Sequence, residues 1–491
     1  MIYNNPRILE INTRVWLKKK NYNSLNEIPD SQILDWAELG FDYIWFMGIW
    51  KINKEIISKY CFEPGLVASY NEALKDWNKD DVIGSPYAIS EYSVNPDIGT
   101  EEDLLNLKKR LNAVGIKLIV DFVSNHFSIG TELLKTNKEI FLPADEYFYK
   151  SDPHTFFASP FNPTEFYAHG RDPLFLAWQD TVQVNYFSPA ARTFMINVLN
   201  KISTLADGVR CDMAMLTLNN VFNNTWIGPL RKYGFEKPEK EFWFEAISSL
   251  RNSNSSFVFI AEAYWNLEWQ LQQLGFNFTY DKTLLDRLAN NEIRGVKDHL
   301  NAEDDYQKKS VRFIENHDEQ RCASKFGKDK SMAAATVIST IKGMIFYHDG
   351  QFEGKKIKLP VQLRREQFEK TDERIQKYYH KLLRITKNQV FRLGEWKQLD
   401  TIPLNENDTS SEKIFAWQWI YKSESRVVAI NYSGSTSRCR LKFTVPDNGI
   451  LVNLFDELNS VSYERSIQEI NEQGLFIELK AFSSHIFALK L

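Results

Sequence analysis

The sequence has few cysteines and no strong net charge. Its four cysteines are far apart among 491 residues, so none of the short-spaced cysteine motifs for metal or redox chemistry is present. Reduced thiols, and therefore a cytoplasmic location, are the simplest expectation. The formal net charge is only -4, from 60 basic and 64 acidic residues. Such a balance gives no field to attract nucleic acid or an anionic membrane.

The sequence also lacks long apolar runs. None approaches the roughly 20 residues needed to span a bilayer. The N-terminus, Met1-Ile-Tyr-Asn-Asn-Pro-Arg7, has no basic segment followed by an apolar one, as a secretory signal would. We expect neither membrane insertion nor export.

What is present fits a soluble protein with a large core. Hydrophobic residues make up 43% and charged residues 25% of the chain, which leaves little room for disorder. The length suits one large barrel with a smaller domain. Aromatic residues reach 14%, and such rings can cover the apolar faces of sugars, although most belong to the core. A neutral substrate is expected.

Short apolar runs alternate with stretches of helical spacing over the first 350 residues, as in a parallel α/β sheet. The predicted strands cover residues 8–17, 43–49, 116–122, 205–210, 257–262, 276–280, 311–316 and 343–347. One intervening helix has clear ends, since Thr100 and Asp103 resemble a capping box and Gly115 suits a C-terminal cap. Eight such units predict a (β/α)8 TIM barrel.

The gap after the third strand and the end of the chain depart from this alternation. Residues 127–203 exceed ordinary loop lengths and predict an inserted domain. From about residue 396 the pattern changes to strand-like runs broken by turn residues, which predicts an all-β C-terminal sandwich domain over 396–491. The catalytic barrel would then occupy residues 1–395.

Polar motifs lie at the carboxyl-terminal ends of four of the predicted strands. Asp121-Phe-Val-Ser-Asn-His126 closes the third and Gly208-Val-Arg-Cys-Asp212 the fourth. Arg210 and Asp212 share one face of their strand, because side chains alternate, and an arginine holds a neighbouring carboxylate ionised. An ionised carboxylate can act as a nucleophile.

The other two motifs add two further carboxylates. Ile260-Ala-Glu262 closes the fifth strand and Asn316-His317-Asp318 the seventh. Retaining glycoside cleavage uses two carboxyl groups roughly 5–5.5 Å apart, one as nucleophile and one as acid. Close like charges raise one pKa, which would keep Glu262 protonated beside an ionised Asp212. Any one motif alone could be structural, but four at barrel strand ends predict an active site.

These four segments, in this order, resemble the conserved regions of the α-amylase superfamily of glycoside hydrolases and transglycosylases. The resemblance covers nearly the whole chain. It implies Asp212 as nucleophile, Glu262 as general acid/base and Asp318 as a carboxylate that binds sugar hydroxyls. It also implies substrate-binding or supporting roles for five more residues: Tyr87, Asp121, His126, Arg210 and His317.

The sequence departs from the family at its usual calcium site. Asn125 is present, but the segment after Asp212 reads Met213-Ala-Met-Leu216, and Val182-Gln-Val-Asn185 has no aspartate. Calcium takes six to eight oxygen ligands, usually with carboxylates among them. We therefore predict no metal and no other cofactor. Met215 and Leu216 are expected to pack the barrel wall.

The resemblance implies hydrolysis of maltooligosaccharides or α-glucans through a covalent intermediate on Asp212. A transglycosylase is the main alternative, because the carboxylates do not decide whether water or a sugar resolves that intermediate. A phosphorylase and a non-catalytic binding or partner subunit are further alternatives. Oligomeric state and bond preference are left open.

Overall fold

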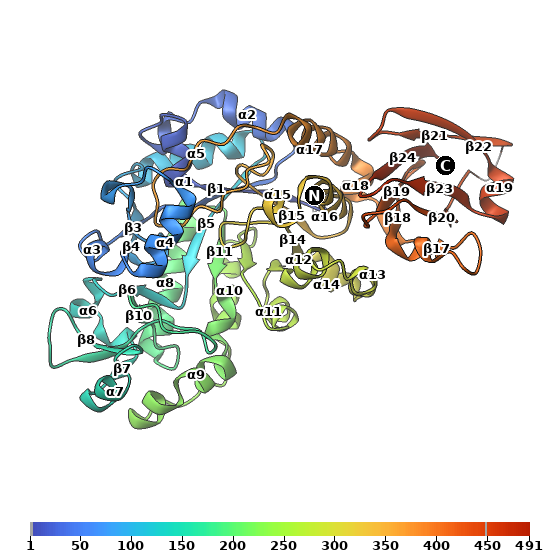
Figure 1. Ribbon diagram of the computed structural model, residues 1–491. Helices are drawn as coiled ribbons and strands as arrows, with labels where there is room; N and C mark the ends of the chain where they lie inside the picture. The colour runs from blue at the N-terminus through green and yellow to red at the C-terminus, as the bar shows by residue number, and fades with distance from the viewer. Residues whose placement is uncertain (1–2, 447–448) are drawn as a thin grey trace.

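The computed structural model describes residues 3–446 and 449–491, and its centre is a closed barrel of eight parallel strands in the order β1-β15-β14-β13-β12-β11-β5-β2 (Figure 1). The strands are β1 (Arg7–Asn12), β2 (Tyr43–Met47), β5 (Lys117–Val123), β11 (Gly208–Asp212), β12 (Val258–Ala261), β13 (Phe278–Tyr280), β14 (Ser310–Arg312) and β15 (Met344–His348). Nearly all their residues are buried, as strands covered on both faces require. The predicted TIM barrel is confirmed.

Helices surround the barrel. The main ones are α2 (Asp30–Glu38), α5 (Glu101–Ala113), α8 (Pro189–Leu205), α10 (Phe242–Ser253), α11 (Glu268–Gln273), α12 (Lys282–Ala289), α16 (Lys328–Thr340) and α17 (Glu373–Thr386). Further helices are α1 (Thr13–Lys19), α9 (Asn219–Lys232), α13 (Ile293–Leu300), α14 (Asp304–Lys308), α15 (Cys322–Lys325) and α18 (Gln389–Leu393). The capping box that begins α5 is confirmed, because Thr100 Oγ1 accepts from Asp103 N–H and the Asp103 carboxylate accepts from Thr100 N–H. Gly115 has the positive φ of +83° that glycine tolerates best.

Three predicted strands differ from the observed ones by three or more residues at one end. The first stops at Asn12, and residues 13–17 begin α1, whose buried apolar face accounts for the long apolar run. The fourth starts at Gly208, because Leu205 is the last residue of α8. The seventh stops at Arg312, so Phe313–Asn316 leave the ladder before the polar motif. Short apolar runs fit a buried helical turn as well as a strand, which explains the first two errors.

Two insertions rise from the carboxyl-terminal side of the barrel. The one after β2 holds β3 (Trp50–Ile52), α3 (Ile57–Tyr60), α4 (Pro64–Ala73), η2 (Lys79–Asp81) and β4 (Ile89–Val94). The one after β5 holds β6 (His126–Ser128), α6 (Leu133–Thr136), η3 (Lys138–Ile140), β7 (Pro143–Ala144), α7 (Glu146–Ser151), β8 (Phe156–Ala158), β9 (Phe166–Ala168) and β10 (Thr181–Gln183). The end of the range 127–203 is α8, which packs against α5 and α10 around the barrel.

The C-terminal region contains two antiparallel sheets, ordered β16-β18-β19-β24-β21-β22 and β17-β20-β23. Their strands are β16 (Glu395–Gln398), β17 (Thr401–Ile402), β18 (Ile414–Tyr421), β19 (Glu424–Asn431), β20 (Ser437–Leu441), β21 (Leu451–Asp456), β22 (Val461–Ser466), β23 (Leu475–Leu479) and β24 (Ser484–Lys490). A 3-10 turn, η5 (Thr409–Lys413), and one short helix, α19 (Ile467–Glu472), accompany them. We propose the domain boundary at 395/396, where β16 begins.

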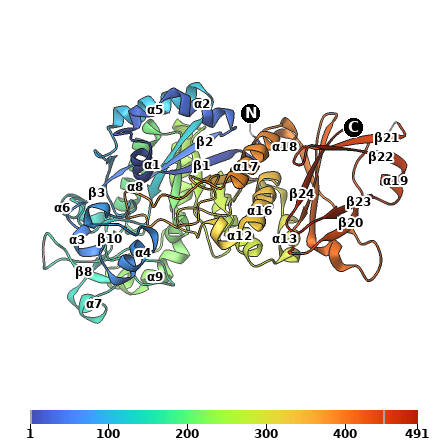
Figure 2. The same ribbon diagram turned by 45° about the horizontal axis from the view of Figure 1, so that its top comes forward.

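This β domain lies at one side of the barrel, next to α16 and α18 (Figure 2). The indole N–H groups of Trp417 and Trp419 donate to Thr340 Oγ1 (3.2 Å) and Thr340 O (2.7 Å) at the end of α16. Both rings are buried and belong to the same apolar core as the barrel helices. The domain therefore covers the apolar side of α16. Among the described residues, we find no helix with the length and apolarity to cross a membrane.

Candidate active site

The three predicted catalytic carboxylates lie at the carboxyl-terminal ends of three barrel strands. Asp212 is the last residue of β11, Glu262 follows β12 directly, and Asp318 lies in the loop after β14. Asp212 and Glu262 are 7% and 3% exposed, whereas the Asp318 side chain is 53% exposed. This end of a TIM barrel is where such folds place their reactive groups.

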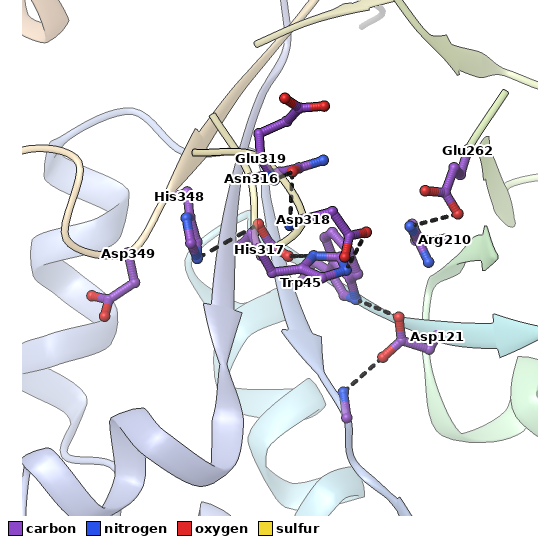
Figure 3. A network of polar contacts seen from close by, with 12 residues as sticks. Trp45, Asp121, Arg210, Glu262, Asn316, His317, Asp318, Glu319, His348 and Asp349 are labelled. Carbon is purple, nitrogen blue, oxygen red and sulfur yellow. Dashed lines mark hydrogen bonds and ion pairs between the residues drawn. The ribbon is translucent and has the colours of Figure 1, made fainter. Parts of the chain in front are cut away.

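Arg210 joins two of the carboxylates. Its Nη1 donates to Asp212 Oδ1 at 2.7 Å. Its Nη2 forms an ion pair with Glu262 Oε2 at 2.8 Å, which Figure 3 shows. The guanidinium is fully buried and lies 5.1–5.6 Å from the ring centres of three aromatic residues: Trp45, Tyr87 and Tyr280. The strand register also sets Arg210 beside Asp121 of β5. One buried cation thus organises the centre of the site.

Burial dominates the pKa values of this pair. It raises the pKa of Asp212 above its ordinary value, even though Arg210 acts in the opposite direction. The arginine therefore lowers the pKa as the sequence suggested, but burial outweighs it. For Glu262, burial and the neighbouring Asp212 raise the pKa to about 7 against the pull of Arg210. Glu262 can therefore hold a proton near neutral pH, as a general acid must.

Two groups that sequence reasoning missed hold the Glu262 carboxylate. The backbone N–H of Met213 donates to Oε2 at 2.7 Å, and the Tyr264 hydroxyl donates to Oε1 at 2.8 Å. Met213 has a left-handed backbone (φ 41°, ψ 48°), which is uncommon for a side chain of its size and marks a functional constraint. A backbone group leaves no signal in the sequence, whereas Tyr264 directly follows the Glu262 motif.

His317 is the centre of a second charged cluster. Its Nε2 lies 2.7 Å from the Tyr87 hydroxyl and 3.0 Å from Asp318 Oδ2, and its Nδ1 contacts the buried Glu10 carboxylate. The Tyr87 ring stacks on the imidazole at 5.4 Å. Glu10 was not predicted, yet a lone carboxylate within the apolar run of β1 was an available signal.

The two carboxylates in this cluster become stronger acids. Although the Asp318 side chain is 53% exposed, partial desolvation at the mouth of the site would raise its pKa, but His317 outweighs this effect and holds that pKa well below its usual range. Burial would likewise raise the pKa of Glu10, but His317 and His348 lower it. The pKa of His317 is raised by Asp318 and Glu10 in spite of burial. The cluster is thus an imidazolium between two carboxylates.

Asp121 and His126 complete the set of predicted residues. Asp121 accepts from Gly48 N–H at 2.7 Å and Trp45 Nε1–H at 3.2 Å, and burial raises its pKa to about 7 (Figure 3). Burial lowers the pKa of His126 to about 4, so this imidazole is neutral. The Trp178 ring lies 5.1 Å from it. The structure therefore gathers all eight predicted site residues at one mouth of the barrel.

The residues at the usual calcium position do not fit that ion. Gln183 Nε2 lies 2.9 Å from Asn125 Oδ1 and 2.9 Å from Asn125 O, and Asn125 Nδ2 donates to Gln183 Oε1 at 3.2 Å. Two amides thus satisfy each other, without a carboxylate for calcium. Met215 and Leu216 are buried and pack the wall. Within residues 3–446 and 449–491 there is no group of three or more His, Cys, Asp or Glu side chains that could hold a metal.

The closed barrel and its cluster of carboxylates define a (β/α)8 protein with a polar reaction site at the strand ends. The family model of the α-amylase catalytic domain matches residues 32–398. The chain belongs to the α-amylase family of glycoside hydrolases.

Relatives and solved structures agree with this assignment. The chain is 24% identical over 306 residues to Alpha-amylase 3 of Dictyoglomus thermophilum, covering 58% of this chain and 57% of that one. It is 22% identical over 370 residues to Alpha-amylase MalA of Haloarcula japonica, covering 70% and 47%. The matched part is thus about half the length of these curated relatives.

The fold is also shared over whole chains. A maltogenic α-amylase, AmyB, from Thermotoga neapolitana has a TM-score of 0.70 at 19% identity, with 100% of both chains covered. An α-amylase from Lactobacillus plantarum has a TM-score of 0.68 at 18% identity, with 99% of both covered. At these identities the likeness shows the fold alone.

Proposed function

We propose that the protein hydrolyses α-glucosidic bonds of maltooligosaccharides or α-glucans with retention of configuration. The observation that carries the proposal is the single buried Arg210, which contacts both Asp212 and Glu262. These two carboxyl groups would serve as nucleophile and acid on one glycosidic bond. The names of the relatives, which are α-amylases, support an α-glucan substrate.

The first step would break the glycosidic bond. Asp212 attacks the anomeric carbon while Glu262 donates its proton to the departing oxygen. Arg210 binds Asp212 Oδ1, which leaves Oδ2 to attack. In the second step Glu262, now ionised, takes a proton from water as that water displaces Asp212. Two inversions at one carbon leave the α configuration.

The remaining site residues would bind the reacting glucose. Asp318 and His317 offer an exposed carboxylate and an imidazole for its hydroxyls, and Tyr87 offers an aromatic surface. Asp121 would support Arg210, and His126 is a neutral hydrogen-bonding group. A cytoplasmic location is also proposed, because the four cysteines are free and buried.

The test is incubation of the purified protein with maltoheptaose, followed by chromatography and by NMR of the newly formed anomeric centre. Shorter products in the α form, absent with Asp212→Asn, are expected. Products of the β form would contradict retention. Products longer than maltoheptaose would instead identify a transglycosylase, and phosphate-dependent sugar phosphates a phosphorylase.

A further inference from the structure

Two long connections, distant in sequence, are joined beside the site. The first, residues 76–84, belongs to the insertion after β2, and the second, residues 358–365, belongs to the connection between β15 and α17. We call this pair of segments the clasp. Ile83 N–H donates to Gln362 O at 2.8 Å, Arg364 N–H donates to Asp81 O at 2.9 Å, and Val82 and Leu363 form a β-bridge.

Charge pairs reinforce the clasp. Arg365 binds Asp81 through two hydrogen bonds of 2.8 and 2.9 Å and reaches Asp76 at 3.0 Å. Asp81 is 1% exposed, and Leu363 is fully buried in a small apolar core with Tyr70 and Leu74 of the insertion. Bidentate arginine–carboxylate pairs hold a fixed geometry. The two connections therefore form one wall.

Arg14 attaches this wall to the barrel. Its Nη2 donates to Val361 O at 2.7 Å and to Gly84 O at 3.0 Å, so one guanidinium binds both segments. Arg14 belongs to α1, directly after β1, and is itself 6% exposed. In Figure 1 the orange chain after β15 runs across the barrel towards α4. Arg14 thus anchors both segments of the clasp to the barrel.

The chemistry of the site identifies which side the clasp occupies. A general acid protonates the departing oxygen, so the leaving group lies on the side of Glu262. The donor sugar lies opposite, against His317 and Asp318. The clasp adjoins that donor side: residue 84 is followed closely by Tyr87, which stacks on His317, and Lys358 donates to the backbone carbonyl of Asp318.

We propose that the clasp closes the donor side of the site, so that the enzyme cleaves α-glucans from their non-reducing ends rather than within the chain. This inference rests on the proposed retaining activity and specifies its substrate class. A glucan that continued beyond the donor site would have to pass through a wall of paired segments, in which Asp81, Val82 and Leu363 are buried. A chain that ends there meets no such obstacle.

The test compares two forms of p-nitrophenyl maltoheptaoside, one free and one carrying a 4,6-O-ethylidene group on its non-reducing glucose. Both forms contain the same internal bonds. We expect the free form to be consumed at least about 100-fold faster. Equal rates would overturn the inference while leaving the proposed function intact. Consumption of neither form would overturn the proposed function itself, and the inference with it.

The variant Arg365→Ala is designed to loosen the clasp. Arg365→Ala removes the pairs with Asp81 and Asp76, and we expect it to raise the rate on the blocked form relative to the free form by about tenfold. The matched control is Arg438→Ala, which removes an arginine pair with Glu478 (2.6 Å) in the β domain and leaves the ratio unchanged. An unchanged ratio in a folded Arg365→Ala protein would contradict the proposed wall. The ratio measured on the wild-type protein decides the question even when this variant fails to fold.

Discussion

Asp212 and Glu262, on one side of the site, and Asp318, on the other, are carboxylates at the same barrel mouth, yet their pKa values shift in opposite directions. Around Arg210, burial exceeds the effect of the cation and the pKa values rise. Around His317, the imidazolium exceeds the effect of burial and the pKa of Asp318 falls. The local partner, rather than the residue type, decides whether a carboxyl group can donate a proton.

The largest effect should come from removing the nucleophile on the Arg210 side. Asp212→Asn keeps the shape of the side chain but cannot form the covalent intermediate, so kcat should fall by about 10⁴-fold. Steady-state kinetics on maltoheptaose measure this. Asp318→Asn should also weaken binding of the donor sugar, visible as a higher KM. A fully active Asp212→Asn protein would show that another group is the nucleophile.

The next largest effect should come from the His317 side. Glu10→Gln removes the buried carboxylate that raises the pKa of His317, so the imidazole should lose its proton at lower pH. We expect kcat to fall about 10- to 100-fold and the pKa of His317, followed by NMR of labelled histidine, to be lower than in the wild-type protein. Asp318 and Tyr87 also face His317, and they stay in place.

The matched control is Glu315→Gln. Glu315 is an equally buried carboxylate in the loop that holds His317, but it pairs with Arg321 at 2.6 Å and with the backbone N–H of Cys322. It should alter thermal stability without lowering the pKa of His317. A His317 titration in Glu10→Gln that coincides with that of the wild-type protein would show that Glu10 has only a structural role.

Local patterns were sufficient to predict most of this fold. Several of the eight strands are continuous apolar runs, and the Thr100–Asp103 capping box lies within one helix turn, so both leave a signal in neighbouring residues. The positions of the three carboxylates followed from the strand ends. Residues 13–17 were mistaken for strand because a short buried helical turn has the same composition.

The partners of those carboxylates could not be predicted in the same way. Glu10 and His317 are separated by 307 positions, and Arg365 and Asp81 by 284. No local pattern indicates such pairs, since they arise only when the barrel closes. The N–H of Met213 depends on a left-handed backbone, which its side chain does not favour.

A smaller effect is expected from loss of the hydrogen bond that Tyr264 donates to Glu262. Tyr264→Phe removes a hydrogen bond that favours the ionised form, so the pKa of Glu262 should rise above about 7 and the alkaline limb should move upwards by a few tenths of a pH unit. We expect kcat to fall only about fivefold. Tyr432→Phe, which removes a buried hydroxyl bonded to Leu288 O at 3.0 Å, is the control and should leave the limb in place. A downward shift would contradict the assignment of this limb to Glu262.

The smallest effect concerns a third polar cluster, the uncharged amide pair of Asn125 and Gln183, which involves stability rather than catalysis. Gln183→Ala leaves buried amide groups unpaired and should lower the free energy of unfolding by about 2 kcal/mol.

A chelator should leave the Tm of the wild-type protein unchanged. In Gln183→Glu, by contrast, a carboxylate would lie beside Asn125 Oδ1, and calcium should raise the Tm. Gln418→Glu, at a buried glutamine of the β domain, should show no calcium response. A wild-type Tm that falls on chelation would mean that the amide pair does not replace a bound ion.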